Sequence, residues 1–395
     1  MGIVAVSLIK ALLRNFPDLV LFTGATIAHL FGLRWFLETG AARRSGWLRW
    51  AAVAETTVSA GLFAFGFLLS YVRVLKYFRP WWATSGRGGV FVWAFASTLM
   101  IIAFGLTRML RRATEQHLPS RRLFLRTVEA AILAAPAAAM GYGVFIERKR
   151  VEMREQRITI PGLHPDLDGL RIVQLTDIHL SSFLPESVLA HAVDMANETR
   201  AKIALVTGDL ISFEGDPVDT CLNHLARLRS DAGTFGCMGN HEIYAGTQEY
   251  TAEQGARLGM RFLRDEAALL RFGAADLNLA GVDYQRMHGV YLRGSERMIV
   301  PGTLNMLLSH NPDVFPVAAE QGWNVTIGGH THGGQVSVEI LHQDLNVARF
   351  FTPYVDGLYR RGDASIFVSR GIGTIGMPVR LGAPPEVALI TLCRT

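Results

Sequence analysis

The stretch IGGHTHGGQ, residues 327–335, sets two histidines two positions apart between two pairs of glycines. An imidazole ring is costly to bury without a partner, and glycine gives up backbone order wherever it occurs. Together they indicate a backbone that bends sharply and brings two ring nitrogens toward one point. A metal ion would explain this arrangement, and so would a tight turn with two surface histidines. The rest of the chain decides between them.

The stretch belongs to a series of apolar runs that begins near residue 155. Helical stretches over residues 185–199 and 216–230 lie between these runs, as in an α/β fold. Most of the runs end in polar residues, and functional groups at the carboxyl ends of strands are the usual arrangement in such folds. The runs that read as buried strands are RIVQLTDIH, KIALVTGDL, GTFGCMGNH, NMLLSHNP, NVTIGGHTH, SIFVSRG and VALITL.

The polar residues at these strand ends form a set with metal-ligand chemistry. Carboxylates mixed with imidazoles suit Mn²⁺, Fe or Zn²⁺ better than Mg²⁺ or Ca²⁺. The set is large enough for two ions, and two ions need a shared bridge, for which Asp209, alone on its strand, is the natural candidate. The candidates are Asp177, His179, Asp209, Asn240, His241, His310, His330 and His332.

The ordered series D-x-H, G-D, G-N-H-E, S-H and G-G-H-T-H resembles the calcineurin-like metallophosphoesterases over residues 157–395. The C-terminal stretch SRGIGTIGMPVRLGAPPEVALITL is similar to the branch that contains membrane-bound or exported bacterial phosphoesterases. The resemblance implies a four-layer αββα sandwich, two divalent metal ions and hydrolysis of a phosphoester or pyrophosphate bond. Some relatives in this branch cleave UDP-2,3-diacylglucosamine in lipid A synthesis.

The resemblance also implies a role for each candidate residue. Two ions about 3.5–4 Å apart can hold an in-line phosphoryl transfer and ionise a bridging water. His241 would not ligate but would face the phosphate, where an imidazole can protonate the leaving oxygen. One departure is that Leu210, Ile211 and Ser212 follow Asp209, where many relatives have an acid or amide. The first ion would be held by Asp177, His179, Asp209 and His332, and the second by Asp209, Asn240, His310 and His330.

The first 150 residues have a different composition. Residues 51–72 and 88–107 are apolar runs of about 20 residues, which is enough to cross a hydrocarbon core of about 30 Å. Residues 17–37 and 127–146 are further candidates, the former with Asp18 and Arg34 placed where they could reach the interface from its ends. A buried soluble bundle is the alternative, but short arginine-rich loops between the runs favour about four membrane spans.

The charge distribution bears on partners and location. The net charge is +5, and the basic residues gather in the first 160 positions, as expected for flanks of membrane spans and not for a nucleic-acid groove. The basic residues of alternate loops nearly balance, so the positive-inside rule gives no clear orientation. The segment SRRLFLR, residues 120–126, resembles a twin-arginine export signal and tips the prediction slightly toward an extracytoplasmic catalytic domain.

These observations predict a multi-pass protein of the cell (inner) membrane, with a helical region over residues 1–150 and a metallophosphoesterase domain over residues 155–395. A bilayer anchor favours a lipid or envelope-precursor substrate, and UDP-2,3-diacylglucosamine is the alternative substrate. A non-enzymatic alternative is an inactive metal-binding scaffold, although a scaffold has no need of His241. Amidohydrolases also use H-x-H at a strand end, but there the pair comes early in the chain.

Overall fold

The computed structural model describes residues 16–71, 81–114, 122–286, 289–340 and 343–395. The chain forms two compact units, Met1–Val144 with Gly376–Pro378, and Phe145–Ile375 with Val379–Thr395. Residues 72–80 and 115–121 lie outside the described residues. They carry part of the basic loops and the first two residues of the twin-arginine-like segment, so these predictions have no structural counterpart here.

The first unit is built from apolar helices, as predicted. Within the described residues, four helices are long and apolar enough to cross a membrane, over Asp18–Leu37, Gly46–Leu68, Ser85–Met109 and Thr127–Lys149. They are apolar on nearly every face, which is typical of helices surrounded by lipid. The helices of the unit are α2 (Phe16–Leu37), α3 (Gly40–Arg44), α4 (Gly46–Tyr71), α6 (Trp81–Thr114) and α7 (Arg122–Phe145).

Apolar and polar contacts join three of these helices. Phe22 on α2, Phe63 on α4 and Phe91 on α6 belong to one buried cluster. The His29 Nε2 atom on α2 lies 3.3 Å from Glu55 Oε1 on α4, and Trp93 Nε1 on α6 donates to Ser59 Oγ on α4 at 2.9 Å. Asp18, near the start of α2, pairs with Arg87 on α6 at 2.6 Å. Polar residues that would be isolated in lipid therefore have partners on neighbouring helices.

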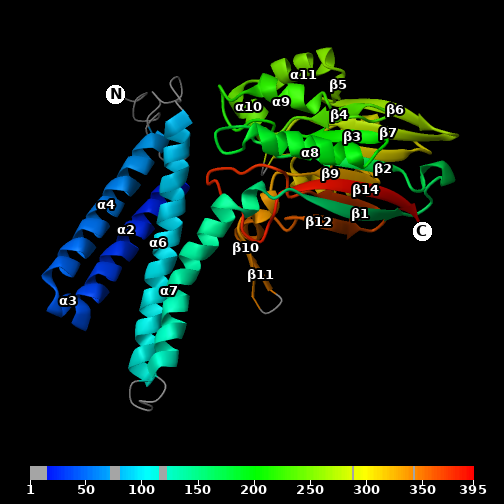
Figure 1. Cartoon of the computed structure of the whole chain (residues 1–395). Coiled ribbons are helices and arrows are strands. Elements are labelled where there is room, and N and C mark those ends of the chain that lie inside the picture. Colours follow the sequence, from blue (N-terminus) through cyan, green and yellow to red (C-terminus); the bar gives the residue numbers. More distant parts are fainter. Residues whose placement is uncertain (1–15, 72–80, 115–121, 287–288, 341–342) are drawn as a thin grey trace. The chain divides into compact units, whose positions relative to one another are not determined.

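The second unit contains two mixed six-stranded sheets and a small β10–β11 hairpin (Figure 1). The first sheet has the order β1-β14-β2-β3-β4-β5, and the second has the order β12-β13-β9-β8-β7-β6. The strands are β1 (Glu152–Ile160), β2 (Arg171–Leu175), β3 (Ile203–Thr207), β4 (Thr234–Cys237), β5 (Met260–Phe262), β6 (Glu266–Phe272), β7 (Ala275–Gly281), β8 (Leu304–Leu308), β9 (Val325–Gly328), β10 (Ser337–Ile340), β11 (Gln343–Asn346), β12 (Gly357–Arg361), β13 (Ala364–Val368) and β14 (Glu386–Arg394).

The two sheets pack face to face and helices cover their outer faces, which confirms the predicted αββα sandwich. One buried cluster joins Leu205 of the first sheet to Met306 of the second. A second cluster packs α8 and α9 on the outer face of the first sheet, and Phe315 of α12 packs against Ile366 on the outer face of the second. The helices are α8 (Glu186–Glu198), α9 (Val218–Leu225), α10 (Asn240–Ala245), α11 (Gln248–Arg257) and α12 (Phe315–Gln321).

Two local features differ from the expectations. The predicted helix over residues 216–230 is too long, because α9 ends at Leu225. The Asn197 side chain donates to the Arg227 carbonyl oxygen at 2.9 Å and accepts from the Arg229 amide at 2.7 Å, which holds the following residues in a non-helical path. The edge strand β1, which no strand-like run predicted, pairs with β14 along its whole length.

Candidate metal centre

The predicted site residues follow the carboxyl ends of five strands of the two sheets. Asp177 and His179 follow β2, Asp209 follows β3, and Asn240 and His241 follow β4 in the first sheet. In the second sheet, His310 follows β8, while His330 and His332 follow β9. The structure brings these residues together, because the five strand ends open toward one region where the two sheets meet.

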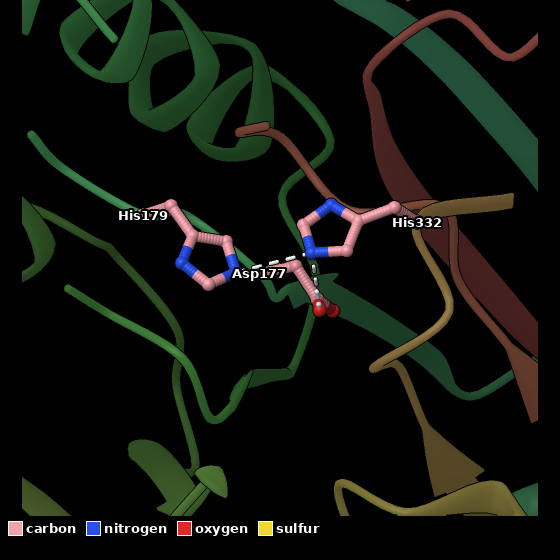
Figure 2. A group of neighbouring side chains, drawn as sticks. All are labelled: Asp177, His179 and His332. Atoms are coloured by element: carbon pink, nitrogen blue, oxygen red, sulfur yellow. Dashed lines mark hydrogen bonds and ion pairs between the residues drawn. The ribbon is translucent and has the colours of Figure 1, made fainter. Parts of the chain in front are cut away.

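One group consists of Asp177, His179 and His332, which Figure 2 shows facing one another. The His179 Nε2 and His332 Nε2 atoms lie 3.0 Å apart, and His332 Nε2 lies 3.3 Å from Asp177 Oδ1. Two imidazole nitrogens this close need a proton or a cation between their lone pairs. Ligands about 2.0–2.2 Å from a metal ion lie about 3–3.5 Å from one another, so this donor set fits an ion.

A second group consists of Asp209, His310 and His330. The His310 Nε2 atom lies 3.0 Å from Asp209 Oδ2, and the His310 and His330 rings are 5.1 Å apart between centroids. The Asn240 side chain is buried, and its Oδ1 atom has no hydrogen-bond partner. A buried carbonyl oxygen without a donor is costly, and a cation would satisfy it. The residues present therefore fit a metal in this group as well.

Asp209 stands between the two groups. The same carboxylate oxygen, Oδ2, lies 3.5 Å from His179 Nε2 and 3.0 Å from His310 Nε2. The other oxygen, Oδ1, accepts a hydrogen bond from the His241 amide at 2.9 Å. This geometry is the arrangement expected of a bridging carboxylate, and it fits the predicted position of Asp209.

The backbone around the site explains the unusual composition of residues 327–335. The candidate ligands Asp177, His179, Asp209, His330 and His332 all have positive φ, between 48° and 76°. This left-handed region is unfavourable for residues with a side chain and is often found at functional sites. Gly329 is needed for a different reason, because a Cβ atom there would lie 2.3 Å from Asp177 Oδ2. The glycines thus allow the backbone to pass directly behind a ligand carboxylate.

Burial keeps most of the imidazoles in the form that binds metal. It lowers the pKa of His179 to about 3 and of His330 to about 4, and it holds the pKa of His332 well below its usual range. Neutral imidazole is the ligand form of histidine. Burial also opposes charge on His310, but the carboxylates of Asp209 and Asp177 raise its pKa to about 10. A metal ion held by His310 and Asp209 would require the neutral form of His310.

His241 lies at the edge of this constellation and is half-buried. Its Nδ1 atom lies 2.5 Å from the Ser212 carbonyl oxygen, which can only accept, so the proton of neutral His241 is assigned to Nδ1. The Ser212 hydroxyl lies 3.1 Å from His179 Nδ1. Ser212 therefore orients two histidines.

Glu242 is a site residue that the sequence reasoning missed. It is fully buried, and its carboxylate accepts hydrogen bonds from the backbone amides of Gly239, Asp209 and Leu210 at 2.8, 2.9 and 2.7 Å. Three amide donors in a buried place stabilise a carboxylate and fix the two loops that carry Asp209 and Asn240. Its position as the last residue of GNHE, beside two site candidates, was the available signal.

The two arginines of the C-terminal segment anchor loops. Arg380 is fully buried and donates to the carbonyl oxygens of His332 at 2.9 Å, Ala383 at 3.1 Å and Arg370 at 2.8 Å. Burial lowers its pKa to about 10, so it stays charged at neutral pH. Arg370 pairs with Asp356 at 3.0 Å. Both arginines are held by internal contacts and act on the site by fixing its loops.

Comparisons with known proteins agree with this geometry. The calcineurin-like phosphoesterase family profile matches residues 170–351. The chain is 30% identical over 294 residues to the uncharacterized metallophosphoesterase YkuE of Bacillus subtilis, an alignment that covers 70% of this chain and 98% of that protein. It is 28% identical over 289 residues to phosphodiesterase YaeI of Escherichia coli, covering 69% and 99% of the two chains. It is also 28% identical over 290 residues to a transmembrane protein with metallophosphoesterase domain of Bos taurus, covering 69% and 64%.

The fold and the strand-end donors define a metal-dependent hydrolase of phosphoester bonds. Within that class, the chain belongs to the calcineurin-like metallophosphoesterases. The predicted family and the predicted enzyme class are thereby confirmed, and the amidohydrolase alternative is wrong. The four apolar helices and the transmembrane relative both favour association with a membrane.

Proposed function

We propose that this protein is a membrane-anchored phosphodiesterase or pyrophosphatase that holds two divalent transition-metal ions and acts on a lipid or envelope precursor. The observation that carries the proposal is the position of Asp209 Oδ2, within 3.5 Å of a histidine of each donor group. The first ion would be held by Asp177, His179, Asp209 and His332, and the second by Asp209, Asn240, His310 and His330.

When bound, two such ions supply positive charge to the phosphate oxygens and activate water as a nucleophile. The protein contributes a rigid frame for this chemistry. Glu242 and Arg380 hold the ligand-bearing loops, and burial of the imidazoles excludes bulk water, which strengthens electrostatic interactions in the site. A frame fixed before the substrate arrives needs little reorganisation during the reaction.

His241 is the proposed general acid. Because Nδ1 faces the Ser212 carbonyl oxygen, Nε2 is the atom that remains for the substrate. In the charged form of His241, Nε2 donates its proton to the oxygen of the leaving group as the phosphorus–oxygen bond breaks. The Ser212 carbonyl oxygen stabilises the proton that stays on Nδ1 and fixes the direction of the ring.

The four apolar helices support the choice of a lipid-like substrate. An anchor of this kind keeps the catalytic unit within a few nanometres of the bilayer and raises the effective concentration of substrates that reside there. A soluble metabolite gains nothing from such an anchor. We propose a multi-pass location in the cell (inner) membrane, with the catalytic unit on the extracytoplasmic side.

Full-length protein in lipid nanodiscs, stripped of metal and reloaded with Mn²⁺, tests the function. The metal-free protein should be inactive, and Mn²⁺ should restore hydrolysis of phosphodiesters, with higher kcat/KM for lipid phosphodiesters than for soluble nucleotides. A preference for the soluble nucleotides would contradict the lipid assignment. Hydrolysis that is unaffected by removal of the metal would contradict the metal assignment.

A reporter fused after Thr395 tests the location. Alkaline phosphatase is active outside the cytoplasm and a green fluorescent protein exported in unfolded form is dark, so the two fusions should give opposite signals. A cytoplasmic C-terminus would contradict the extracytoplasmic assignment and would make UDP-2,3-diacylglucosamine the first substrate to test.

A further inference from the structure

A cavity of about 250 Å³ adjoins the second donor group and is not used by the chemistry described above. His330 forms one part of its wall, and Pro312, Ala348 and Phe351 form others. The same histidine therefore faces both the candidate metal centre and the cavity. A substrate whose phosphate lies at the metal centre would have one of its ester groups within reach of this space.

The polar residues of the cavity wall are engaged with the protein itself. The Asn311 amide donates to the Gln285 carbonyl oxygen at 2.7 Å, and Thr352 Oγ1 donates to Asp313 Oδ1 at 2.5 Å. The Thr331 hydroxyl donates to the Val355 carbonyl oxygen. Because these three side chains are hydrogen-bonded within the protein, much of the cavity surface that a ligand would contact is hydrocarbon.

The exposed part of the wall is aromatic. The Phe351 side chain is 70% exposed, and the neighbouring Phe350 is 84% exposed. Exposure of two adjacent phenylalanine rings to water is unfavourable, and contact of either ring with an apolar group would lower the free energy. Phe350 is the last residue of the 3-10 turn η7 (Val347–Phe350), and Phe351, which follows it, lines the cavity.

The charges of the wall exclude one class of substrate group. Among the described residues that line the cavity, none is lysine or arginine, and Asp313 contributes a carboxylate. A second phosphate, as in a nucleoside diphosphate, would meet the Asp313 carboxylate here, with no lysine or arginine of the lining to pair with it. An uncharged hydrocarbon group would meet no such penalty.

We propose that this cavity is an apolar subsite that receives the hydrocarbon group esterified to the phosphate of the substrate. The inference rests on the proposed function and narrows its substrate class to phosphodiesters with an alkyl or acyl chain close to phosphorus. The cavity has the volume of about eight water molecules at ~30 Å³ each, so it holds a short length of one chain.

A series of p-nitrophenyl phosphodiesters with methyl, butyl and hexyl groups tests the subsite in full-length protein loaded with Mn²⁺. Each diester carries one negative charge, so the esters differ in hydrocarbon length alone. Burial of three additional methylenes in the butyl ester should raise kcat/KM over that of the methyl ester, by at most about 50-fold. Calorimetric binding of methylphosphonate and hexylphosphonate gives the same comparison without turnover, and hexylphosphonate should bind more tightly.

Two variants locate the effect. Phe351→Ser removes the exposed aromatic wall, and Ala348→Asp introduces a charge into the cavity, so both should lower the ratio of butyl to methyl kcat/KM. Leu269→Ser is the matched control, because Leu269 is an exposed apolar residue on β6, 57% exposed, that does not line the cavity. It should leave the ratio unchanged. If Ala348→Asp fails to fold, the exposed Phe351 still gives the decisive variant.

The outcomes separate the subsite from the proposed function. Equal kcat/KM for all esters in the wild-type protein would overturn the subsite and leave the phosphodiesterase assignment intact. A chain-length preference that persists unchanged in Phe351→Ser would also overturn it, because selectivity would then lie elsewhere. If the wild-type protein hydrolyses none of the esters, the proposed function fails and the subsite fails with it.

Discussion

In both the helical unit and the catalytic unit, polar side chains of different elements contact one another, but the two units hold them in different ways. In the helices, His29, Glu55, Ser59 and Trp93 make single contacts between neighbouring elements, within regular backbone. In the catalytic unit, polar residues from five strand ends converge, and several adopt left-handed backbone conformations.

The difference shows what each polar group is for. A contact such as Trp93–Ser59 satisfies two polar groups that would otherwise face hydrocarbon, and its loss leaves the helices able to pack by shape. In the strand-end cluster, hydrogen bonding is incomplete. Asn240 Oδ1 lacks a hydrogen-bond partner, and the Nε2 atoms of His179 and His332 face each other at 3.0 Å. Incomplete satisfaction in rigid surroundings is expected of a site that is made for a ligand.

The largest expected effect comes from Asp209→Asn. The change keeps the shape of the side chain but removes its negative charge, which weakens the binding of both proposed ions. Metal content should fall, and kcat/KM on a chromogenic phosphodiester should drop by at least about 10³-fold, since several kcal/mol of transition-state stabilisation depend on the metals. Metal analysis and steady-state kinetics measure both quantities. Asp168→Asn, which changes a carboxylate outside the donor groups, is the control, and wild-type metal content in Asp209→Asn would refute the bridging role.

His241→Ala should separate catalysis from metal binding. Loss of the proposed general acid should lower kcat by about 10²–10³-fold, whereas bound metal should stay at the wild-type level because His241 is not among the proposed ligands of either ion. The defect should be smaller for p-nitrophenol, a good leaving group that needs little protonation, than for an alkyl leaving group. A loss of metal that parallels the loss of activity would instead make His241 a ligand.

Removal of the helices should have a moderate effect that depends on the substrate. A truncated chain that begins at Glu147 keeps β1 and the buried Glu147 side chain, which is hydrogen-bonded to the backbone of Gly382. It should fold, bind metal and hydrolyse a small soluble diester with kcat/KM within about threefold of the full chain, an expectation based on the separate core of this unit. Its activity on bilayer lipids should fall much further.

A shorter chain that begins at Arg157 sharpens this test. It lacks half of the β1 ladder and the Arg154 guanidinium, which lies 3.1 Å from Asp356 and 3.3 Å from Glu386. We expect it to aggregate, because the buried Glu386 carboxylate then loses a charged partner and residues 386–390 of β14 become an open edge. Equal solubility and thermal stability of the two truncated chains would show that β1 is dispensable.

The smallest expected effect is that of Ser59→Ala in the helices. Loss of the hydrogen bond from Trp93 should lower the free energy of unfolding of the full-length protein in detergent by about 0.6 kcal/mol. Hydrolysis of a soluble diester should not change. A destabilisation of several kcal/mol, or a loss of activity, would show that polar contacts of the helical unit matter as much as those of the catalytic unit.

Much of the molecule could be predicted from the chain of residues alone. The apolar runs are long enough to require helices in a bilayer, and α2, α4, α6 and α7 cover them. The strand-end donors were found because a buried strand followed by a polar residue is a local pattern, and their order along the chain resembles one family. Local periodicity and order therefore determined the fold class, the helices and the set of candidate ligands.

Other features were decided only by the tertiary structure. Glu242 binds the amides of Asp209 and Leu210, Ser212 orients His179 and His241, and Arg380 holds the loop of His332. These contacts join residues that are distant in the chain, and no local period encodes them. The same is true of the cavity beside His330, whose wall combines residues that follow β8 and β9 with Phe351. The sequence alone identified the candidate donor residues. Packing of the two sheets determined which of their oxygen and nitrogen atoms lie close together, because the distance between two strand ends depends on how all the packed elements fit.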